Sequence, residues 1–325
     1  MRTLLVSLCL CLTAGITSIN AEDDDGPRML ENQPLVGTNV NAHGNAGAPA
    51  SIRVDVNMTL VPVAVLDSWG RNVLGLDREN FRVFDGTEPR PIVSFTRSDA
   101  PVSIGLIYDC SRSMSPKFKI ARQAPAKLFE HLNPEDEAFL VTVSDRPELR
   151  HDFTTQLNDL MSTLLFVNPG GSTSLLDGVY LGLHQMKKAH NPRKALIIVS
   201  DGGDNNSRYS LRELAQLAAE SDTQIFSICL WQSPQSAEEI AGPALLAKLS
   251  QVSGGINFMT SDGGAMDSTF AHIGVTLHNE YMLGYYPSGD APAGKYRKIK
   301  VQVLVPAGVP KLQVFARSGY YVPEK

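Results

Sequence analysis

Three oxygen-bearing side chains stand close together directly after an apolar segment of the sequence. Asp109, Ser111 and Ser113 follow the mostly apolar run Val102–Tyr108. A second carboxylate, Asp201, follows another apolar run further along the chain. Ligands of open parallel sheets bind beyond the carboxyl ends of the strands, so we expect these side chains to lie close together.

A third segment, Gly170–Gly178, stands between the other two and leads into a helical pattern. It offers the hydroxyl group of Thr173. All three segments can converge on one point at the same edge of a sheet. The predicted cluster therefore combines carboxylates with hydroxyl groups and contains neither histidine nor cysteine.

Oxygen ligands of this kind suit hard cations such as Mg²⁺, Mn²⁺ or Ca²⁺ and do not suit Zn²⁺. The use of two serines and a threonine in place of further aspartates keeps the charge of the site low. A cation held by few negative charges stays electrophilic and can accept a carboxylate from a partner as its last ligand. We expect Mg²⁺ or Mn²⁺ in preference to Ca²⁺.

The elements that must position these residues alternate between strand and helix from about Val102 to Leu277. Such alternation indicates an α/β fold with a doubly wound, mainly parallel sheet, here of six strands, with helices on both faces. One helix is expected from about Lys117 to Leu132, and Pro125 should kink or split it. Five of the six expected strands are Ile104–Tyr108, Ala138–Val143, Ala195–Ser200, Gln224–Leu230 and Gly255–Met259.

Short strands without intervening helices are expected on both sides of this region. In the first group, Phe81–Phe84 and Ile92–Phe95 flank Asp85-Gly86, which is a hairpin signal. Each group has an apolar face and open edges, and pairing the two groups buries both faces. We therefore predict a small β-sandwich with its halves in 51–97 and 279–325, and the α/β domain, 98–278, inserted between them.

The N-terminus resembles an export signal, because Arg2 precedes an apolar run from Leu4 to Leu12 and small and polar residues follow. We assign a signal peptide to 1–21 and a flexible leader to 22–50. The alternative is a membrane anchor, but the apolar run is shorter than the roughly 20 residues of a spanning helix, and no later segment reaches that length. The mature chain is therefore expected to be secreted or periplasmic, without a transmembrane segment.

Composition excludes one class of partner and indicates how the fold is stabilised. The net charge of −5 and the absence of a basic cluster with a reading motif argue against nucleic acid. Signal removal leaves only Cys110 and Cys229. Both are expected to end strands of one sheet with another strand between them, which is too far apart for a disulfide, so we predict two buried thiols.

The three segments together resemble the metal-ion-dependent adhesion site (MIDAS) of von Willebrand factor type A domains, through Asp109-x-Ser111-x-Ser113, Thr173 after Gly-Gly, and Asp201-Gly. The resemblance covers about 100–277. It implies that Ser111 and Ser113 bind the metal directly, and that Thr173, Asp109 and Asp201 bind it directly or through water. Ser172 and Ser174 leave a one-residue ambiguity beside Thr173. The flanking strands resemble those of secreted, von Willebrand factor type A-related proteins of acidobacteria.

The resemblance implies a binding module and not an enzyme: an adhesion or assembly protein whose protein partner supplies an Asp or Glu carboxylate to the metal. The alternative is a Mg²⁺-dependent hydrolase or phosphoryl-transfer enzyme at the same site. That alternative needs a general base and phosphate-binding elements, and the sequence has no P-loop or Gly-x-Ser-x-Gly motif. Asp204-Asn-Asn206 is interpreted as a turn, because its spacing does not fit a calcium loop.

Overall fold

The computed structural model describes residues 58–325 except 233, 235, 289–291, 306–309 and 323–325. The predicted signal peptide, the leader and residues 51–57 of the predicted sandwich lie outside the described residues. No described helix has both the length and the apolar character needed to cross a membrane. Within the described residues, the strands form one six-stranded and two four-stranded sheets.

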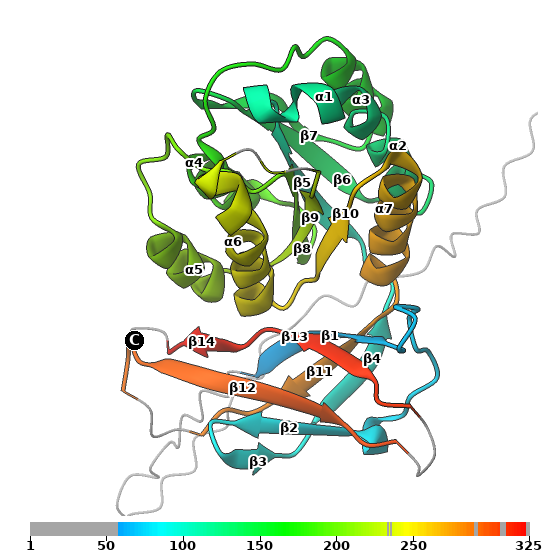
Figure 1. Cartoon of the computed structure of the whole chain (residues 1–325). Coiled ribbons are helices and arrows are strands. Elements are labelled where there is room, and N and C mark those ends of the chain that lie inside the picture. Colours follow the sequence, from blue (N-terminus) through cyan, green and yellow to red (C-terminus); the bar gives the residue numbers. More distant parts are fainter. Residues whose placement is uncertain (1–57, 233, 235, 289–291, 306–309, 323–325) are drawn as a thin grey trace, which may run out of the picture. The chain divides into compact units, whose positions relative to one another are not determined.

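The six-stranded sheet confirms the predicted α/β fold (Figure 1). Its strand order is β10-β9-β8-β5-β6-β7, and all neighbours are parallel except β7, which is antiparallel to β6. The central strands are apolar on both faces, as expected where helices cover both faces of a sheet. The strands are β5 Val102–Asp109, β6 Glu137–Val143, β7 Pro147–Thr154, β8 Arg193–Ser200, β9 Thr223–Leu230 and β10 Asn257–Thr260.

Helices cover both faces of this sheet, and each face has its own apolar core. On one face α1, α2, α3 and α7 pack against side chains such as Leu106 and Tyr108. On the other face α4, α5 and α6 pack against Ile107 and Leu196. The helices are α1 Ser115–Ala121, α2 Pro125–Phe129, α3 Leu157–Leu165, α4 Leu175–Gln185, α5 Leu211–Glu220, α6 Ala237–Ser253 and α7 Gly263–Leu277.

The helix expected at 117–132 is divided, as Pro125 predicted. The first part ends at Ala121, and the second begins at Pro125 itself, in the first turn of α2. Proline lacks the N–H that a helix interior needs but is well accommodated in the first turn, where that N–H has no helical partner. The break leaves α1 as a short helix directly after the loop that carries Ser111 and Ser113.

The remaining strands form two antiparallel four-stranded sheets, β13-β1-β11-β4 and β14-β12-β2-β3. Each sheet contains strands from both ends of the chain, so neither end forms a sheet alone. The strands are β1 Thr59–Leu66, β2 Phe81–Asp85, β3 Glu88–Arg90, β4 Ser94–Ser98, β11 Glu280–Tyr285, β12 Tyr296–Val303, β13 Gln313–Ala316 and β14 Gly319–Tyr321.

The predicted hairpin between Phe81–Phe84 and Ile92–Phe95 is wrong. Asp85 pairs with Glu88, so the chain reverses through a two-residue loop in which Gly86 has a φ of 66°. So short a loop makes the residues immediately after it the return strand, and β3 ends before Pro91. The later strand, β4, pairs with β11 in the other sheet.

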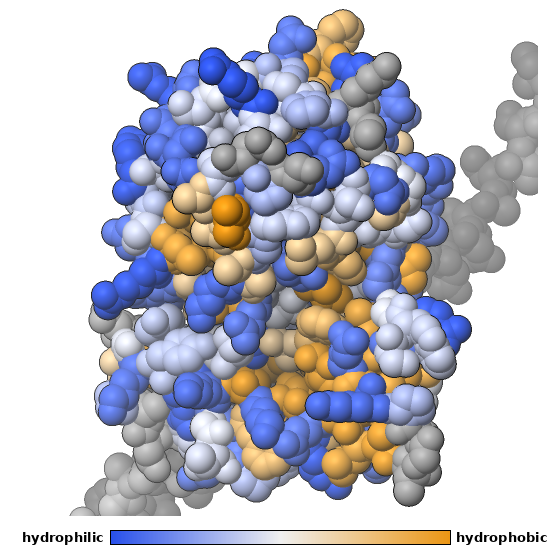
Figure 2. Space-filling view, viewed as in Figure 1, coloured by the Kyte–Doolittle hydropathy of each residue, from blue (hydrophilic) through white to orange (hydrophobic). Residues whose placement is uncertain are grey.

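The first described strand, β1, is buried on both faces in its second half, from Val63 to Leu66. Val61, Val63 and Val65 belong to the apolar core between the two antiparallel sheets, whereas Ala64 and Leu66 pack into the core that contains α7. This strand therefore connects the packing of the sandwich with that of the α/β part. Figure 2 shows more apolar surface on the visible side of the sandwich than on that of the α/β part.

Both cysteines are free and buried, as predicted. Cys110 follows β5 and Cys229 lies in β9, and β8 lies between these two strands. The separation of two strand spacings is too large for a disulfide. Burial raises the pKa of the Cys229 thiol to about 11, so this thiol stays protonated near neutral pH.

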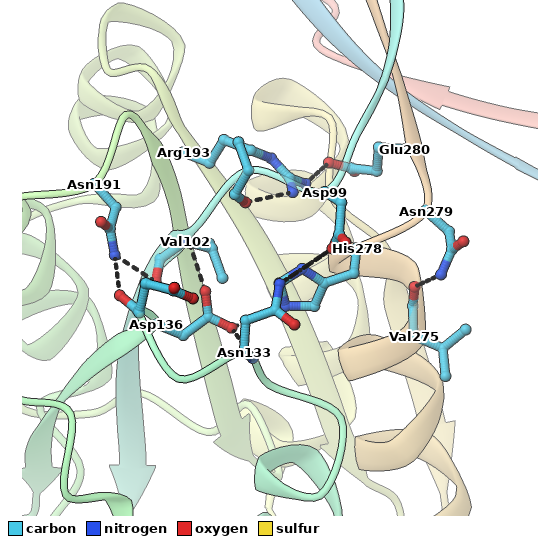
Figure 3. A network of polar contacts seen from close by, with 12 residues as sticks. Asp99, Val102, Asn133, Asp136, Asn191, Arg193, Val275, His278, Asn279 and Glu280 are labelled. Carbon is cyan, nitrogen blue, oxygen red and sulfur yellow. Dashed lines mark hydrogen bonds and ion pairs between the residues drawn. The ribbon is translucent and has the colours of Figure 1, made fainter.

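A buried polar network lies where the α/β part meets the sandwich (Figure 3). Arg193, at the start of β8, places Nη2 2.7 Å from Oε2 of Glu280, at the start of β11. Oε1 of Glu280 accepts a hydrogen bond of 2.7 Å from Gln224. Nearby, His278 contacts the carboxylate of Asp136 at 2.9 Å. Charged and polar groups of both parts thus satisfy one another away from water.

Candidate metal site

Asp109 ends the central strand β5 and is fully buried. Its Oδ1 accepts a hydrogen bond of 2.9 Å from the backbone N–H of Ser111. Its Oδ2 accepts one of 2.5 Å from the hydroxyl of Ser200, at the end of the neighbouring strand β8. The carboxylate is therefore held at the carboxyl end of the sheet by the loop after β5 and by the end of β8, in the position predicted for a ligand site.

Direct hydrogen bonds join the three loops that carry the predicted ligands. The N–H of Gly170 donates to the carbonyl of Cys110 at 2.7 Å, and the N–H of Arg112 donates to the carbonyl of Gly171 at 3.2 Å. The N–H of Asn205, beyond Asp201, donates to the carbonyl of Thr173 at 3.1 Å. The structure thus brings together the three segments that carry Asp109, Ser111, Ser113, Thr173 and Asp201.

The middle loop distinguishes Thr173 from its two hydroxyl neighbours. Ser174 precedes α4 and donates its hydroxyl proton to the carbonyl of Ser144 at 2.8 Å, away from the cluster. Ser172 is exposed, whereas Thr173 is buried and its N–H donates to Oδ1 of Asn205 at 3.0 Å. Among the three hydroxyls, that of Thr173 has the environment best suited to a fixed ligand.

The third loop fixes Asp201 by close packing of backbone. Gly202 has a φ of 82°, and a Cβ atom there would lie 2.5 Å from the Cα of Gly242 in α6. Only glycine combines this left-handed conformation with so close an approach. Oδ1 of Asp201 accepts a hydrogen bond of 3.2 Å from the N–H of Gly203, and Oδ2 lies 3.1 Å from Nζ of Lys117.

Two buried carboxylates lie in one site, so it is costly for both of them to be ionised at once. Burial and the nearby charge of Asp201 raise the pKa of Asp109 to about 6, although hydrogen bonds from Ser111 and Ser200 lower it in part. Like charges and desolvation both disfavour the ionised form. A cation bound between the two carboxylates would offset both effects.

The donor set fits a hard divalent cation. The hydroxyl oxygens of Ser111 and Ser113 lie 3.2 Å apart. Two ligands at right angles, each about 2.1 Å from Mg²⁺, lie about 3.0 Å apart, so both hydroxyls can bind one ion with little movement. The described residues hold no cluster of three or more His, Cys, Asp and Glu side chains suited to a metal.

Asp204 has a structural role, which supports the interpretation of Asp204-Asn-Asn206 as a turn. Its Oδ2 accepts hydrogen bonds from the N–H of Leu176 at 2.8 Å and from the hydroxyl of Ser207 at 2.6 Å. Asp177 likewise accepts from the N–H groups of Arg208 and Tyr209. These carboxylates order the start of α4 and the loop after Asp201.

A groove of about 470 Å³ opens beside the predicted ligands. Ser113 and Thr173 line it, together with Asp145, Arg112 and the start of α6 with Glu238. Its walls are thus polar and carry charges of both signs. A side chain of a partner can approach the two hydroxyls through this groove.

Two polar neighbours of the site were not predicted from the sequence. Ser200 immediately precedes Asp201, and its hydroxyl holds Asp109. Lys117 stands four residues after Ser113, which is one helical turn, but α1 begins only at Ser115. The position of Ser200 at a strand end and the helical spacing of Lys117 were the available signals.

The family comparison agrees with the geometry. Residues 104–203 match the model of the von Willebrand factor type A domain. The chain contains a von Willebrand factor type A domain. The match begins in β5 and ends just beyond Asp201, so it includes all five predicted ligands. No match was found among the curated proteins.

Several solved structures are similar to this type A domain chain. A von Willebrand factor type A protein from Catenulispora acidiphila matches 84% of this chain and 76% of its own, with 10% identity and a TM-score of 0.48. BatB from Bacteroides thetaiotaomicron matches 54% of this chain and 98% of its own, with 15% identity and a TM-score of 0.43. Proximal thread matrix protein 1 from the mussel byssus, with a zinc-occupied MIDAS motif, matches 59% and 49%, with 14% identity and a TM-score of 0.48.

Proposed function

We propose that this protein binds a protein partner through a divalent cation, Mg²⁺ or Mn²⁺, held by Asp109, Ser111, Ser113, Thr173 and Asp201. The observation that carries the proposal is the convergence of hydroxyls and buried carboxylates from three loops of a type A domain. The bound cation would supply an electrophilic centre for an Asp or Glu carboxylate of the partner.

The residues of the chain prepare the site before any partner arrives. The Ser200 hydroxyl and the Ser111 N–H fix both oxygens of Asp109. Gly202 allows the loop of Asp201 to pack against α6. Because these contacts hold the ligand side chains in place, little rearrangement is needed for binding, and preorganised sites bind more tightly.

The proposal includes export and a two-part architecture. The apolar run Leu4–Leu12 supports a signal peptide in 1–21, followed by a leader in 22–50. We assign the type A domain to 98–278 and the sandwich to 51–97 and 279–325. The protein would then act in the periplasm or outside the cell, in adhesion or complex assembly, and the acidobacterial resemblance of the flanking strands stays a prediction.

A hydrolase that uses the same site is the second candidate function, and the charges around the site bear on the choice between the two functions. The groove holds Arg112 as a cationic side chain, but the surrounding carboxylates Asp145, Glu238 and Glu239 would repel a phosphate group. Turnover of p-nitrophenyl phosphate that disappears in Asp109→Ala would favour the enzyme. Binding of the divalent cation without turnover of p-nitrophenyl phosphate would favour the adhesion module.

A carboxylate is expected to strengthen cation binding if the partner completes the site. In calorimetric titrations of Mn²⁺ into the protein, excess acetate should increase the apparent affinity several-fold, because the anion supplies the missing ligand. Chloride at equal ionic strength is the control for screening. Equal Mn²⁺ affinity in acetate and chloride would contradict the role assigned to the partner carboxylate.

A further inference from the structure

A buried ammonium group lies inside the candidate metal site. Lys117, on α1, places Nζ 3.1 Å from Oδ2 of Asp201, and the two side chains are only 6% and 3% exposed. Lysine is rarely buried to this extent unless a specific partner holds it. The other oxygen of Asp201 accepts the N–H of Gly203, so Lys117 occupies the side of the carboxylate that the loop leaves open.

The charges around this ammonium explain its position. Asp109 and Asp201 are both buried at the ends of neighbouring strands, and each raises the electrostatic cost of the other. Lys117 offsets part of this negative charge from within the protein. It is therefore an internal cation at a place where a divalent cation is proposed to bind.

We propose that Lys117 competes with the divalent cation for Asp201 and thereby sets the metal affinity of the site. This inference rests on the proposed metal site. An ammonium and a divalent cation beside one carboxylate repel each other, and the repulsion is strong where water is excluded. The long, flexible stem of lysine allows the ammonium to withdraw when the metal binds.

This competition links metal binding to α1. The helix begins at Ser115, directly after the loop of Ser111 and Ser113, and its residue Lys117 contacts the third loop. In the metal-free protein the ion pair ties α1 to the carboxyl end of β8. Metal binding releases that tie and frees one cationic side chain beside the site.

The test is calorimetric titration of Mn²⁺ into the parent protein and into Lys117→Met. Methionine keeps most of the apolar stem and removes the charge. The variant is expected to bind Mn²⁺ about tenfold or more tightly than the parent, because repulsion is lost. The matched control is Lys127→Met, which removes an exposed lysine that pairs with Glu130 at 2.7 Å, and its affinity should equal that of the parent.

The outcomes separate this inference from the proposed function. If the parent binds Mn²⁺ and Lys117→Met binds it no more tightly, the competition is refuted and the metal site stands. If only Lys117→Met binds Mn²⁺, the competition is supported in its strongest form. If neither protein binds Mn²⁺, the metal site fails, and the inference fails with it.

A second measurement keeps the inference testable if Lys117→Met does not fold. Acetylation of lysines in the parent protein, read by mass spectrometry, reports which ammonium groups reach solvent. Lys117 should be protected without metal and become reactive with saturating Mn²⁺, while the exposed Lys127 stays equally reactive. Unchanged protection of Lys117 at saturation would overturn the proposal.

Discussion

Replacing Arg193 with methionine is expected to lower the free energy of unfolding by about 3–5 kcal/mol, as for other broken buried ion pairs. Arg193 and Glu280 are 7% and 0% exposed, so the substitution leaves a carboxylate buried without its counter-charge. Gln224 still donates to Oε1 of Glu280, but it carries no charge. The expected loss can be measured by urea denaturation near neutral pH.

The control for Arg193→Met is an exposed ion pair in the same molecule. Arg71 and Asp67 are also 2.7 Å apart, but the arginine is 71% exposed, so Arg71→Met should lower the free energy of unfolding far less than Arg193→Met does. Burial raises the pKa of Glu280, and the charge of Arg193 opposes that rise. The cost of Arg193→Met should therefore shrink at acidic pH, where Glu280 is protonated. Equal costs for the two variants would contradict this interpretation.

Replacing Asp109 with asparagine is expected to stabilise the metal-free protein by about 2–3 kcal/mol above pH 7, from about 1.4 kcal/mol per pKa unit. Burial and the charge of Asp201 raise the pKa of Asp109 to about 6, above its ordinary value of 3.8. The folded protein thus binds a proton more tightly than the unfolded chain does. Stability in EDTA should fall as the pH rises from about 4 through about 6, and Asp109→Asn should remove the part of that fall that Asp109 causes, whereas the part from Glu280, whose pKa is also raised, should stay.

Asparagine is the appropriate substitution because it can keep both hydrogen bonds of Asp109. Its oxygen can accept the N–H of Ser111, and its amide can donate to the hydroxyl of Ser200. The same variant should lose the stabilisation that Mn²⁺ gives the parent, because the site lacks a carboxylate. Urea denaturation in EDTA and in Mn²⁺ measures both effects.

The control for Asp109→Asn is an aspartate whose charge stabilises the fold. Burial raises the pKa of Asp136, but hydrogen bonds from His278, Val102 and Asn133 outweigh it and lower the pKa overall. The ionised carboxylate of Asp136 stabilises the fold above the pKa that it has in the unfolded chain, and this stabilisation is lost as the pH falls through its pKa in the folded protein. Asp136→Asn should therefore lower the free energy of unfolding near neutral pH. An Asp109→Asn protein less stable than the parent in EDTA above pH 7 would contradict the electrostatic account.

The central sheet could be predicted because its signals are local. Apolar runs such as Ala195–Ser200 are buried on both faces, and their alternation with helical stretches indicates parallel strands. The pairing of the outer strands could not be predicted in the same way. The period of apolar residues indicates which face of a strand is buried but not which strand pairs with it. The sequence therefore predicted β4 as the partner of β2, whereas in the structure β3 pairs with β2 and β4 pairs with β11.

The sequence predicted which loops form the candidate site, but it did not predict the contacts that α1 makes with them. Asp109, Ser111 and Asp201 follow apolar runs directly, so their place at one edge of the sheet follows from the topology. The contact between Lys117 and Asp201 depends on the direction in which α1 follows the loop of Ser111 and Ser113. The helix α1 is short because it ends before Pro125. Contacts of this kind depend on tertiary packing that periodicity alone does not specify.

The most direct test of the metal site is calorimetric titration of Mg²⁺ and Mn²⁺ into the parent protein and a Ser111→Ala/Ser113→Ala variant that unfolds at the same temperature without metal. The two hydroxyls lie 3.2 Å apart, and neither alanine can replace an oxygen ligand. We predict binding to the parent and an affinity at least about 100-fold lower in the variant, since the two serine hydroxyls expected to bind the metal directly are lost. Equal affinity in the two proteins would contradict a metal site at Ser111 and Ser113.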